Sequence, residues 1–540
     1  MLTRKEVLQM LSALPVGGFM ASQGLAGNLT RRPGAELGRG PLSLDEDLFR
    51  SIGVEPVINC RGTFTIIGGS IEHPHVKEAM RAASNNFIQY DELAFGIGER
   101  LAEITGAEWG MVSAGCAAAL KHVTAACVAG GNPEVLIRIP DLRDVEKNEV
   151  IMPRHSRTTY DHAIRNIGVK MVMVDTPEEL QSAMSNRTAM ICLMSGRTGP
   201  LGLENVSRMA RERGIPVLVD AAAEDLTIPN VHLAGGADVV TYSGGKAMNG
   251  PQCSGLILGD KKILMSAWQA SSPHHGPGRD NKVGREEMIG LLAAVEAWVM
   301  RDHEAEWQRW LGWLNQIGDR ARQVRGVQTE IQEPTGLGNR TPRLRISWNP
   351  EQFHVTGAEV AEELARTPPR IALGSGDGPD GQTSVSITSG QMQPGNAEIV
   401  ADRIHELLSR QRSPKPAMRR PGGTITGRWI ADLEFYSSSS QHTLFIEEQD
   451  GNWIRGAHQG DYSTRDLAGT IEGNEVKLVS TDRRPGDRVT YIFIGTLENG
   501  AFSGRVFMGE YLEAQFTANR YERSDERREI MVPDGPPLAT

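Results

Sequence analysis

The chain has 540 residues, 39% of them hydrophobic and 23% charged, which is too apolar for a disordered protein. Its 57 basic and 67 acidic residues give a net charge of −10, and this disfavours a protein that binds mainly to a nucleic-acid backbone. No apolar run approaches the roughly 20 residues that span a bilayer. The five cysteines are odd in number and lack a CxxC motif, so we expect neither a disulfide framework nor a metal site.

Residues 1–42 have the order of an export signal followed by a linker. Arg4 and Lys5 precede an apolar stretch at 7–21, and small residues follow. The pattern resembles a twin-arginine signal in which Lys5 stands in place of the second arginine. We therefore expect an exported, periplasmic protein. The alternative is an amphipathic helix at the start of a cytoplasmic protein.

Residues 43–300 are predicted to form a large α/β domain with an N-terminal arm. Short runs such as VLVD and AMICLM suit strands that are buried on both faces, and helical patterns lie between them. This alternation predicts a mostly parallel sheet with helices on both sides. The expected strands are 110–114, 149–152, 170–174, 188–194, 216–220, 239–243 and 254–259, and the expected helices include 118–128, 177–184 and 204–213.

One long helical stretch, residues 286–324, is predicted to connect this domain to a smaller α+β domain at 301–410. Its apolar residues recur at steps of three and four. The smaller domain is expected to hold the elements 343–348, 357–365, 383–388 and 396–408.

A Pro- and Arg-rich linker at 411–423 precedes a change to period-two patterning. Residues 424–522 are predicted to form about eight antiparallel strands in a small up-and-down barrel or sandwich, with turn signals such as Asn499-Gly500. Trp429, Trp453 and Tyr491 are expected in its core, or alternatively at a ligand-binding barrel mouth. Residues 523–540 are expected to be a disordered tail.

The chemistry is indicated by Asp220 and Lys246. Asp220 ends a predicted buried strand, and Lys246 follows the next strand after a Ser-Gly-Gly turn. In an α/β sheet ligands bind at the carboxyl ends of strands. An Asp and a Lys so placed suit pyridoxal 5'-phosphate (PLP): the Lys forms the Schiff base and the Asp pairs with the pyridinium nitrogen. The alternative is a helix-capping Asp and a surface Lys.

A second element is the small-residue turn at 113–119, which leads into a helix. Backbone N–H groups at a helix start can hold a phosphate, and Ser243 can add a hydroxyl. Small residues at a helix start are also a common packing solution.

From residue 56 to 298, and more loosely to 408, the chain resembles the SelA-like branch of fold-type-I PLP enzymes. The matching segments are VINCRGTFTIIGGS (57–70), ERLAEITGAEWGMVSAGCAAAL (99–120), PRHSRTTYDHAIRNIG (153–168), VLVDAAAE (217–224), YSGGKAMNGPQCSGLILG (242–259) and GRDNKVGREEMIGLLAAVEA (278–297). The SGGK-x-x-x-GPQ-x-x-G motif carries most of this resemblance.

The resemblance implies roles for individual residues. Lys246 would carry the cofactor, Asp220 would pair with its ring nitrogen, and His155 would stack on the ring unless it is a solvated loop residue. The phosphate would be held by Gly115, Cys116, Ala117 and Ser243. Arg61, Arg279, Lys282 and Arg285 are candidates for binding an anionic substrate, although 279–285 can also be a solvated charge run.

One departure concerns the substrate carboxylate. The family often has an Arg shortly before a Pro-Gly in the small domain, whereas this chain reads SITSGQMQPG at 386–395. Arg370 is the predicted substitute.

The expected activity is α,β-elimination of a hydroxyamino acid or amino-sugar acid, with ammonia release. The alternatives are selenium transfer to seryl-tRNA, aminotransferase or racemase chemistry, and a catalytically silent scaffold. A homo-oligomer is expected by resemblance only.

Overall fold

The computed structural model describes residues 48–481 and 489–522, together with Leu44 and Gly535. The predicted export signal and, apart from Gly535, the predicted tail lie outside the described residues. The described chain divides into two compact units, one at 48–415 and the other at 416–481 with 489–522. Among these residues no helix is both long and apolar enough to cross a bilayer.

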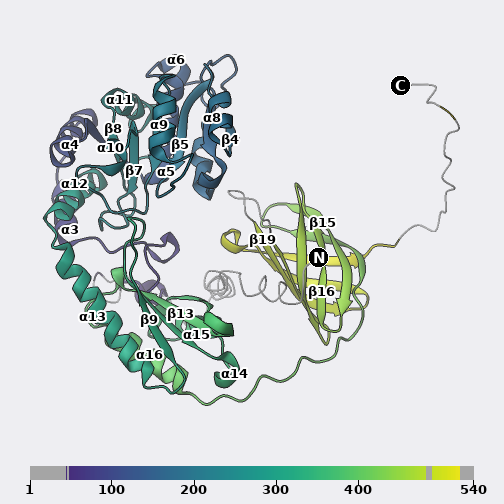
Figure 1. Cartoon of the computed structure of the whole chain (residues 1–540). Helices are drawn as coiled ribbons and strands as arrows, with labels where there is room; N and C mark the ends of the chain where they lie inside the picture. The colour runs from purple at the N-terminus through teal and green to yellow at the C-terminus, as the bar shows by residue number, and fades with distance from the viewer. Residues whose placement is uncertain (1–43, 45–47, 482–488, 523–534, 536–540) are drawn as a thin grey trace. The chain divides into compact units, whose positions relative to one another are not determined.

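A mostly parallel seven-stranded sheet is the centre of the larger lobe of the first unit (Figure 1). Its strand order is β2-β8-β7-β6-β5-β3-β4, and only β8 runs antiparallel to its neighbours. The strands are β2 (Trp109–Ser113), β3 (Glu149–Pro153), β4 (Lys170–Val174), β5 (Thr188–Met194), β6 (Val217–Asp220), β7 (Val239–Ser243) and β8 (Gly255–Gly259). Every residue of β2, β3, β6 and β8 is buried, as the continuous apolar runs predicted.

Helices cover the sheet, and α5 is buried along most of its length. The helices of this lobe are α3 (Pro74–Ala83), α4 (Tyr90–Thr105), α5 (Cys116–Ala129), α6 (Pro133–Leu136), α7 (His162–Arg165), α8 (Pro177–Ala183), α9 (Leu203–Arg211), α10 (Val231–Ala234), α11 (Lys261–Ala270) and α12 (Arg285–Met300). The expected α/β architecture of the large domain is therefore confirmed.

The prediction of one continuous helix at 286–324 is wrong, because the chain forms two helices there. Helix α12 ends at Met300, and α13 (His303–Arg322) begins after Asp302, whose side chain accepts a hydrogen bond of 2.9 Å from Ala305 N. An Asp at this position satisfies an N–H that the helix leaves free. Asp302 therefore starts a second helix at a point where the apolar periodicity of the sequence shows no break.

The smaller lobe contains the antiparallel sheet β12-β13-β10-β9 and helices packed on it. Its elements are β9 (Gln328–Gln332), β10 (Arg343–Trp348), α14 (Pro350–Phe353), α15 (Gly357–Arg366), β11 (Arg370–Ala372), β12 (Gly374–Asp377), β13 (Thr383–Thr388) and α16 (Asn396–Ser409). The N-terminal arm joins this lobe, since β1 (Val57–Asn59) pairs in parallel with β11.

The second unit is a closed antiparallel barrel of eight strands in up-and-down order. Its strands are β14 (Gly427–Glu434), β15 (Ser439–Asp450), β16 (Trp453–Gln459), β17 (Thr464–Glu472), β18 (Glu475–Thr481), β19 (Thr490–Glu498), β20 (Ala501–Phe507) and β21 (Glu513–Arg520). Asn499 and Gly500 both have positive φ in the turn between β19 and β20, as the Asn-Gly signal predicted. The structure thus decides for a barrel over a sandwich.

Candidate active site

The carboxyl ends of the parallel strands place the predicted cofactor residues at one edge of the sheet. Asp220 is the last residue of β6, and Lys246 lies three residues beyond β7, the neighbouring strand. Helix α5 begins just after β2 at the same edge. Burial raises the pKa of both Asp220 and Cys116, and Lys246 is near enough for its charge to oppose both rises.

Asp220 is a buried carboxylate that lacks one partner. Its side chain is 4% exposed, and Oδ1 accepts hydrogen bonds from Ala222 N (3.1 Å) and from the thiol of Cys116 (3.5 Å). Oδ2 has no hydrogen-bond partner among the described residues. Burial raises the pKa of Asp220. A cationic N–H at Oδ2 would offset this burial, and a protonated pyridine nitrogen is such a group.

The turn that carries Lys246 is held tightly by its surroundings. Gly244 N donates to Ser254 O (2.9 Å), and a Cβ on Gly244 would lie 2.0 Å from Ser254 Oγ. The buried guanidinium of Arg301, in the break between α12 and α13, donates to Ala247 O, Met248 O and Asn249 Oδ1. Lys246 is therefore presented on a rigid turn, while its ammonium makes no hydrogen bond within the described chain.

The start of α5 forms the expected anion cradle. Its N-cap, Gly115, has φ 100° and supplies no side-chain cap, and the first helical bond runs from Ala119 N to Gly115 O. The N–H groups of residues 116–118 are thus free for a ligand. Gly255 of β8 leaves room beside them, because a Cβ there would lie 2.8 Å from Cys116 N. The buried acid, the lysine turn and this cradle fit PLP.

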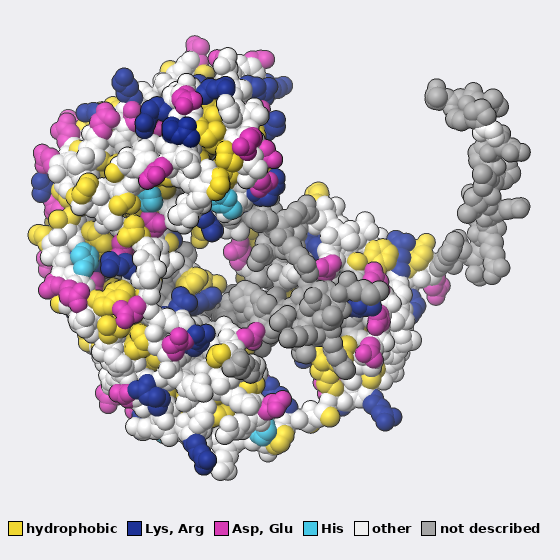
Figure 2. All heavy atoms as spheres, viewed as in Figure 1, with side chains coloured by type: hydrophobic (Ala, Val, Ile, Leu, Met, Phe, Trp, Pro, Cys, Tyr) yellow, Lys and Arg dark blue, Asp and Glu magenta, His cyan; other side chains and the backbone are white. Residues whose placement is uncertain are grey.

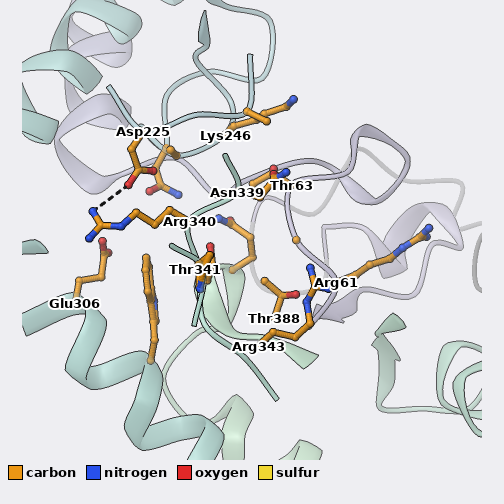
Figure 3. Close-up of a pocket in the computed structure, with 18 of the residues that line it drawn as sticks. Arg61, Thr63, Asp225, Lys246, Glu306, Asn339, Arg340, Thr341, Arg343 and Thr388 are labelled. Carbon is orange, nitrogen blue, oxygen red and sulfur yellow. Dashed lines mark ion pairs between the residues drawn. The ribbon is translucent and has the colours of Figure 1, made fainter. Parts of the chain in front are cut away.

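A cavity of about 690 Å³ lies between the two lobes of this unit. Figure 3 shows Lys246 on its large-lobe side, Asp225 and Arg340 at one end, and Arg61 and Arg343 at the other. A volume of this size suits a cofactor with a small substrate. Its charged and titratable lining residues are Arg61, Tyr160, Asp225, Lys246, His303, Glu304, Glu306, Glu333, Arg340 and Arg343.

Asp225 and Arg340 form an ion pair across the two lobes, with Arg340 Nη1 3.7 Å from Asp225 Oδ2 (Figure 3). Burial raises the pKa of Asp225 to about 6, and Arg340 opposes that rise. The cavity thus holds a carboxyl group that can change protonation near neutral pH.

Main-chain hydrogen bonds join the same two segments. Asp225 N donates to Leu337 O (3.1 Å), and Asn339 N donates to Ala223 O (2.7 Å). The segment after β6 and the segment before β10 therefore form one continuous wall.

The other predicted cofactor residues lie near this edge with less contact. Ser243 ends β7, and its N–H donates to Ala222 O (3.3 Å). His155 follows β3 in a 3-10 turn (Arg154–Ser156); its side chain is exposed and does not line the cavity. Arg61 does line the cavity, on a turn shaped by Asn59, whose Oδ1 accepts from Arg61 N and Gly62 N at 3.0 Å.

Four predicted substrate cations do not line the cavity. The predicted substitute, Arg370, donates instead to Ala365 O (2.6 Å) and Glu55 O (3.3 Å), and so fixes the arm to the small lobe. Arg285 caps α3 by donating to Ala83 O and Ser84 O at 3.1 Å. Arg279 is exposed and contacts Ser272 Oγ at 3.4 Å, and Lys282 is exposed nearby.

Arg343 is a cavity residue that the sequence analysis missed. It is the first residue of β10 and lies directly opposite Thr388 of β13. Its guanidinium lines the cavity and makes no hydrogen bond or ion pair with the described residues. Thr388 belongs to the segment from which the family arginine is absent. The sequence does show an Arg at the start of a predicted strand. Its position beside the cavity follows only from the pairing of β10 with β13. Asp225, Arg340 and Tyr160 were also missed, because segments far apart in the chain bring them to one cavity.

Comparisons with known proteins agree with this geometry. Residues 74–243 match the model of the DegT/DnrJ/EryC1/StrS aminotransferase family. The chain is 29% identical to D-glucosaminate-6-phosphate ammonia lyase of Salmonella typhimurium, over 59% of this chain and 86% of the relative. It is 30% identical to 5'-C-glycyluridine monooxygenase-decarboxylase of Streptomyces sp., over 67% and 92%.

A solved structure of D-glucosaminate-6-phosphate ammonia-lyase superposes with a TM-score of 0.60 at 27% identity, covering 67% of this chain and 98% of that one. The site geometry and these relatives agree on the cofactor, PLP, and on an enzyme. The chain belongs to the SelA-like branch of the fold-type-I PLP-dependent enzymes.

Proposed function

We propose that this enzyme catalyses α,β-elimination of an amino acid or amino-sugar acid that carries a hydroxyl at Cβ, with release of ammonia. The observation that carries the proposal is that a lysine and a carboxyl group of raised pKa, Lys246 and Asp225, line one cavity. Elimination needs a base at Cα and an acid at the leaving group.

Lys246 and Asp220 serve the Cα side of the reaction. When bound, PLP supplies the electron sink that stabilises negative charge at Cα. Asp220 holds the proton on the ring nitrogen through its free Oδ2, and Lys246 Nζ removes the Cα proton. The rigid glycine turn and Arg301 keep Lys246 at the face of the cavity.

Asp225 serves the leaving group. In its protonated form it gives a proton to the departing hydroxyl, which leaves as water. Arg340 keeps the pKa of Asp225 from rising further, so the carboxyl stays acidic enough to give up its proton to the leaving group.

Arg343 and Arg61 provide the anion contacts of the substrate. Arg343 has an unpaired guanidinium at the cavity wall, where a carboxylate fork fits. Arg61 packs over the Phe64 ring at 4.4 Å, and burial lowers the pKa of Arg61. A second anionic group, such as a sugar phosphate, can occupy this end.

The test is a screen of D- and L-hydroxyamino acids and amino-sugar acids, with and without a terminal phosphate, that measures 2-oxo acid and ammonia. Stoichiometric release of both products supports elimination, and both should form more slowly in Asp225→Asn. Amino-group transfer to an added oxo acid without free ammonia would instead indicate an aminotransferase.

The same reactions should be monitored for carbon dioxide and oxygen uptake, because one relative is named a monooxygenase-decarboxylase. Selenium transfer to seryl-tRNA is the less favoured alternative. The visible face in Figure 2 shows acidic and basic side chains interspersed and no continuous basic stripe, and the net charge of −10 opposes RNA binding.

We also propose a homo-oligomer, because the N-terminal part of the described chain exposes large apolar side chains. Phe49, Phe64, Ile66 and Phe87 are each between 47% and 98% exposed. Light scattering on the purified enzyme tests this proposal. Export by a twin-arginine route stays a separate proposal, tested by sequencing the N-terminus of the protein from a periplasmic fraction.

A further inference from the structure

One end of the C-terminal barrel has a polar interior, in contrast to the rest of its core. In an up-and-down barrel alternate turns meet at the same end, so the start of β15, the end of β16 and the start of β17 lie together. The same end contains the end of β18 and the start of β19. The inward-facing residues there are His442, His458, Arg465, Ser480 and Tyr491, whereas the opposite half is lined by residues such as Trp429, Ile454, Ile471 and Phe502.

Three of these polar groups, together with Asp461, form a hydrogen-bonded chain. Ser480 Oγ is 2.9 Å from His458 Nδ1, and His458 Nε2 is 2.9 Å from His442 Nδ1. His442 Nε2 in turn lies 3.5 Å from Oδ2 of Asp461, in the turn after β16. The side chains of the two histidines and Ser480 are buried.

The histidines in this chain are neutral. Burial lowers the pKa of His458 to about 3, and it lowers the pKa of His442 as well. With one proton on each ring, every donor points toward Asp461: Ser480 donates to His458, His458 to His442, and His442 to the carboxylate. Asp461 also accepts from Ser440. Both carboxylate oxygens of Asp461 therefore already accept a hydrogen bond from Ser440 or His442.

Two nitrogen atoms of the Arg465 guanidinium lack an acceptor within the described part of the chain. Its Nε and Nη1 atoms are buried and have no hydrogen-bond partner among the described residues. Its guanidinium carbon lies 5.2 Å from the ring centroid of Tyr491. A Cβ on Gly460 would lie 2.9 Å from Arg465 Nη1 and 3.5 Å from His442 Cε1, so the guanidinium sits beside the histidine chain. Buried N–H donors that stay unpaired are costly, so an anion that accepts from them would stabilise this end of the barrel.

We propose that this end of the barrel binds a small organic molecule through an oxyanion group, a carboxylate or a phosphate, that pairs with Arg465. The histidine chain lies beside the bound group and holds the wall in one arrangement. Tyr436, Tyr462 and Tyr511 are 57–99% exposed in turns at the same end, and they supply ring surface for the body of the ligand. This site is independent of the proposed elimination reaction.

The proposal is tested on the full-length, PLP-loaded chain by calorimetric titration with benzoate, acetate and inorganic phosphate. The structure predicts saturable binding of at least one probe, weakened more than tenfold in Arg465→Met. The matched control is Arg505→Met, because Arg505 lies on the outer face of β20 in an exposed ion pair with Glu513 (3.4 Å). The affinity of this variant for the probe should stay within about twofold of wild type. Binding of either kind of probe supports the proposal. Binding of benzoate or acetate identifies the ligand group as a carboxylate, and binding of inorganic phosphate identifies it as a phosphate.

Two further measurements keep the test decisive if Arg465→Met does not fold. Gly460→Ala places a methyl group against the guanidinium and should weaken the same probe. In the wild-type chain, the probe should slow hydrogen exchange in β15 and β16. If no probe binds, or if binding is unchanged in Arg465→Met or Gly460→Ala, the proposal is overturned.

Discussion

The thiol of Cys116 lies 3.5 Å from Oδ1 of Asp220 and 3.0 Å from Oγ1 of Thr241. Burial raises the pKa of Cys116 well above its usual range, so the group remains a thiol and donates to the carboxylate. The first residue of the helix proposed to hold the phosphate thereby supports the residue proposed to pair with the ring nitrogen. The two halves of the cofactor site are coupled through this single side chain.

Substituting Cys116→Ala should weaken PLP binding without abolishing it. The change removes one hydrogen bond to a charged acceptor, worth about 1.5 kcal/mol, or roughly tenfold in the dissociation constant. Absorbance titration of the apoenzyme measures the effect. Cys253→Ala is the control, because Cys253 is exposed. Equal affinities for both variants would contradict the supporting role of Cys116.

Substituting Lys246→Ala should abolish turnover while the fold and PLP binding through Asp220 and the α5 cradle persist. Borohydride reduction followed by peptide mapping should attach the cofactor to the Lys246 peptide in wild type only. Substituting Lys261→Ala serves as the control, since Lys261 starts α11 away from the cavity. Modification of a different lysine would refute the assignment of Lys246.

The protonated carboxyl of Asp225 should produce a falling limb in the pH profile of kcat/KM. Its pKa of about 6 in the free enzyme means that the acid is lost as the pH rises through 6. Arg340→Met removes the cation that lowers this pKa, so the limb should move to higher pH. Asp225→Asn should remove the limb and lower the rate. A limb that stays in place in Arg340→Met would speak against Asp225 as its origin.

The apoenzyme should lose stability as the pH rises, owing to Asp220. Burial raises its pKa above the unfolded value, so the native state binds the proton more tightly than the unfolded state. The free energy of unfolding therefore falls as the pH rises from the ordinary carboxyl range through the raised pKa. Asp220→Asn should flatten this slope in denaturant titrations of the apoenzyme, and the holoenzyme should lose PLP affinity. An unchanged slope would show that Asp220 is not the group responsible.

Substituting Arg343→Met should raise KM at least tenfold with little change in kcat, because the residue anchors the substrate and does not touch the reacting atoms. The matched control is Arg345→Met on the same strand, whose guanidinium pairs with Glu330. Steady-state kinetics on the best substrate of the screen separate the two constants. A loss confined to kcat would place Arg343 in a different role.

Much of the fold could be predicted because its strands are buried on both faces. The bounds of the buried strands β5 and β7 agree residue for residue with the prediction, and β6 differs only in beginning at Val217. Such strands leave a continuous apolar run whose ends are marked by polar residues or Gly. The Asp-and-Lys arrangement was also predictable, because the ends of neighbouring parallel strands must meet.

The small-lobe side of the cavity could not be predicted in the same way. Arg343 and Thr388 are 45 positions apart and meet only through the register of β10 with β13. Arg370, which follows Pro368 and Pro369, is the predicted substitute for the family arginine, yet its guanidinium donates to the main-chain carbonyls of Ala365 and Glu55. Local sequence does not record which arginines are already paired.

The wall formed by Ala223, Asp225, Leu337 and Asn339 also determines how molecules reach the cavity. Opening that side would break two main-chain hydrogen bonds and the Asp225–Arg340 pair together. Passage is therefore expected at the opposite side, past the Arg61 turn, which Asn59 shapes. The N-terminal arm then lines the entrance to the cavity. Substitutions in the arm are expected to change which substrates enter more than they change the rate of the chemical step.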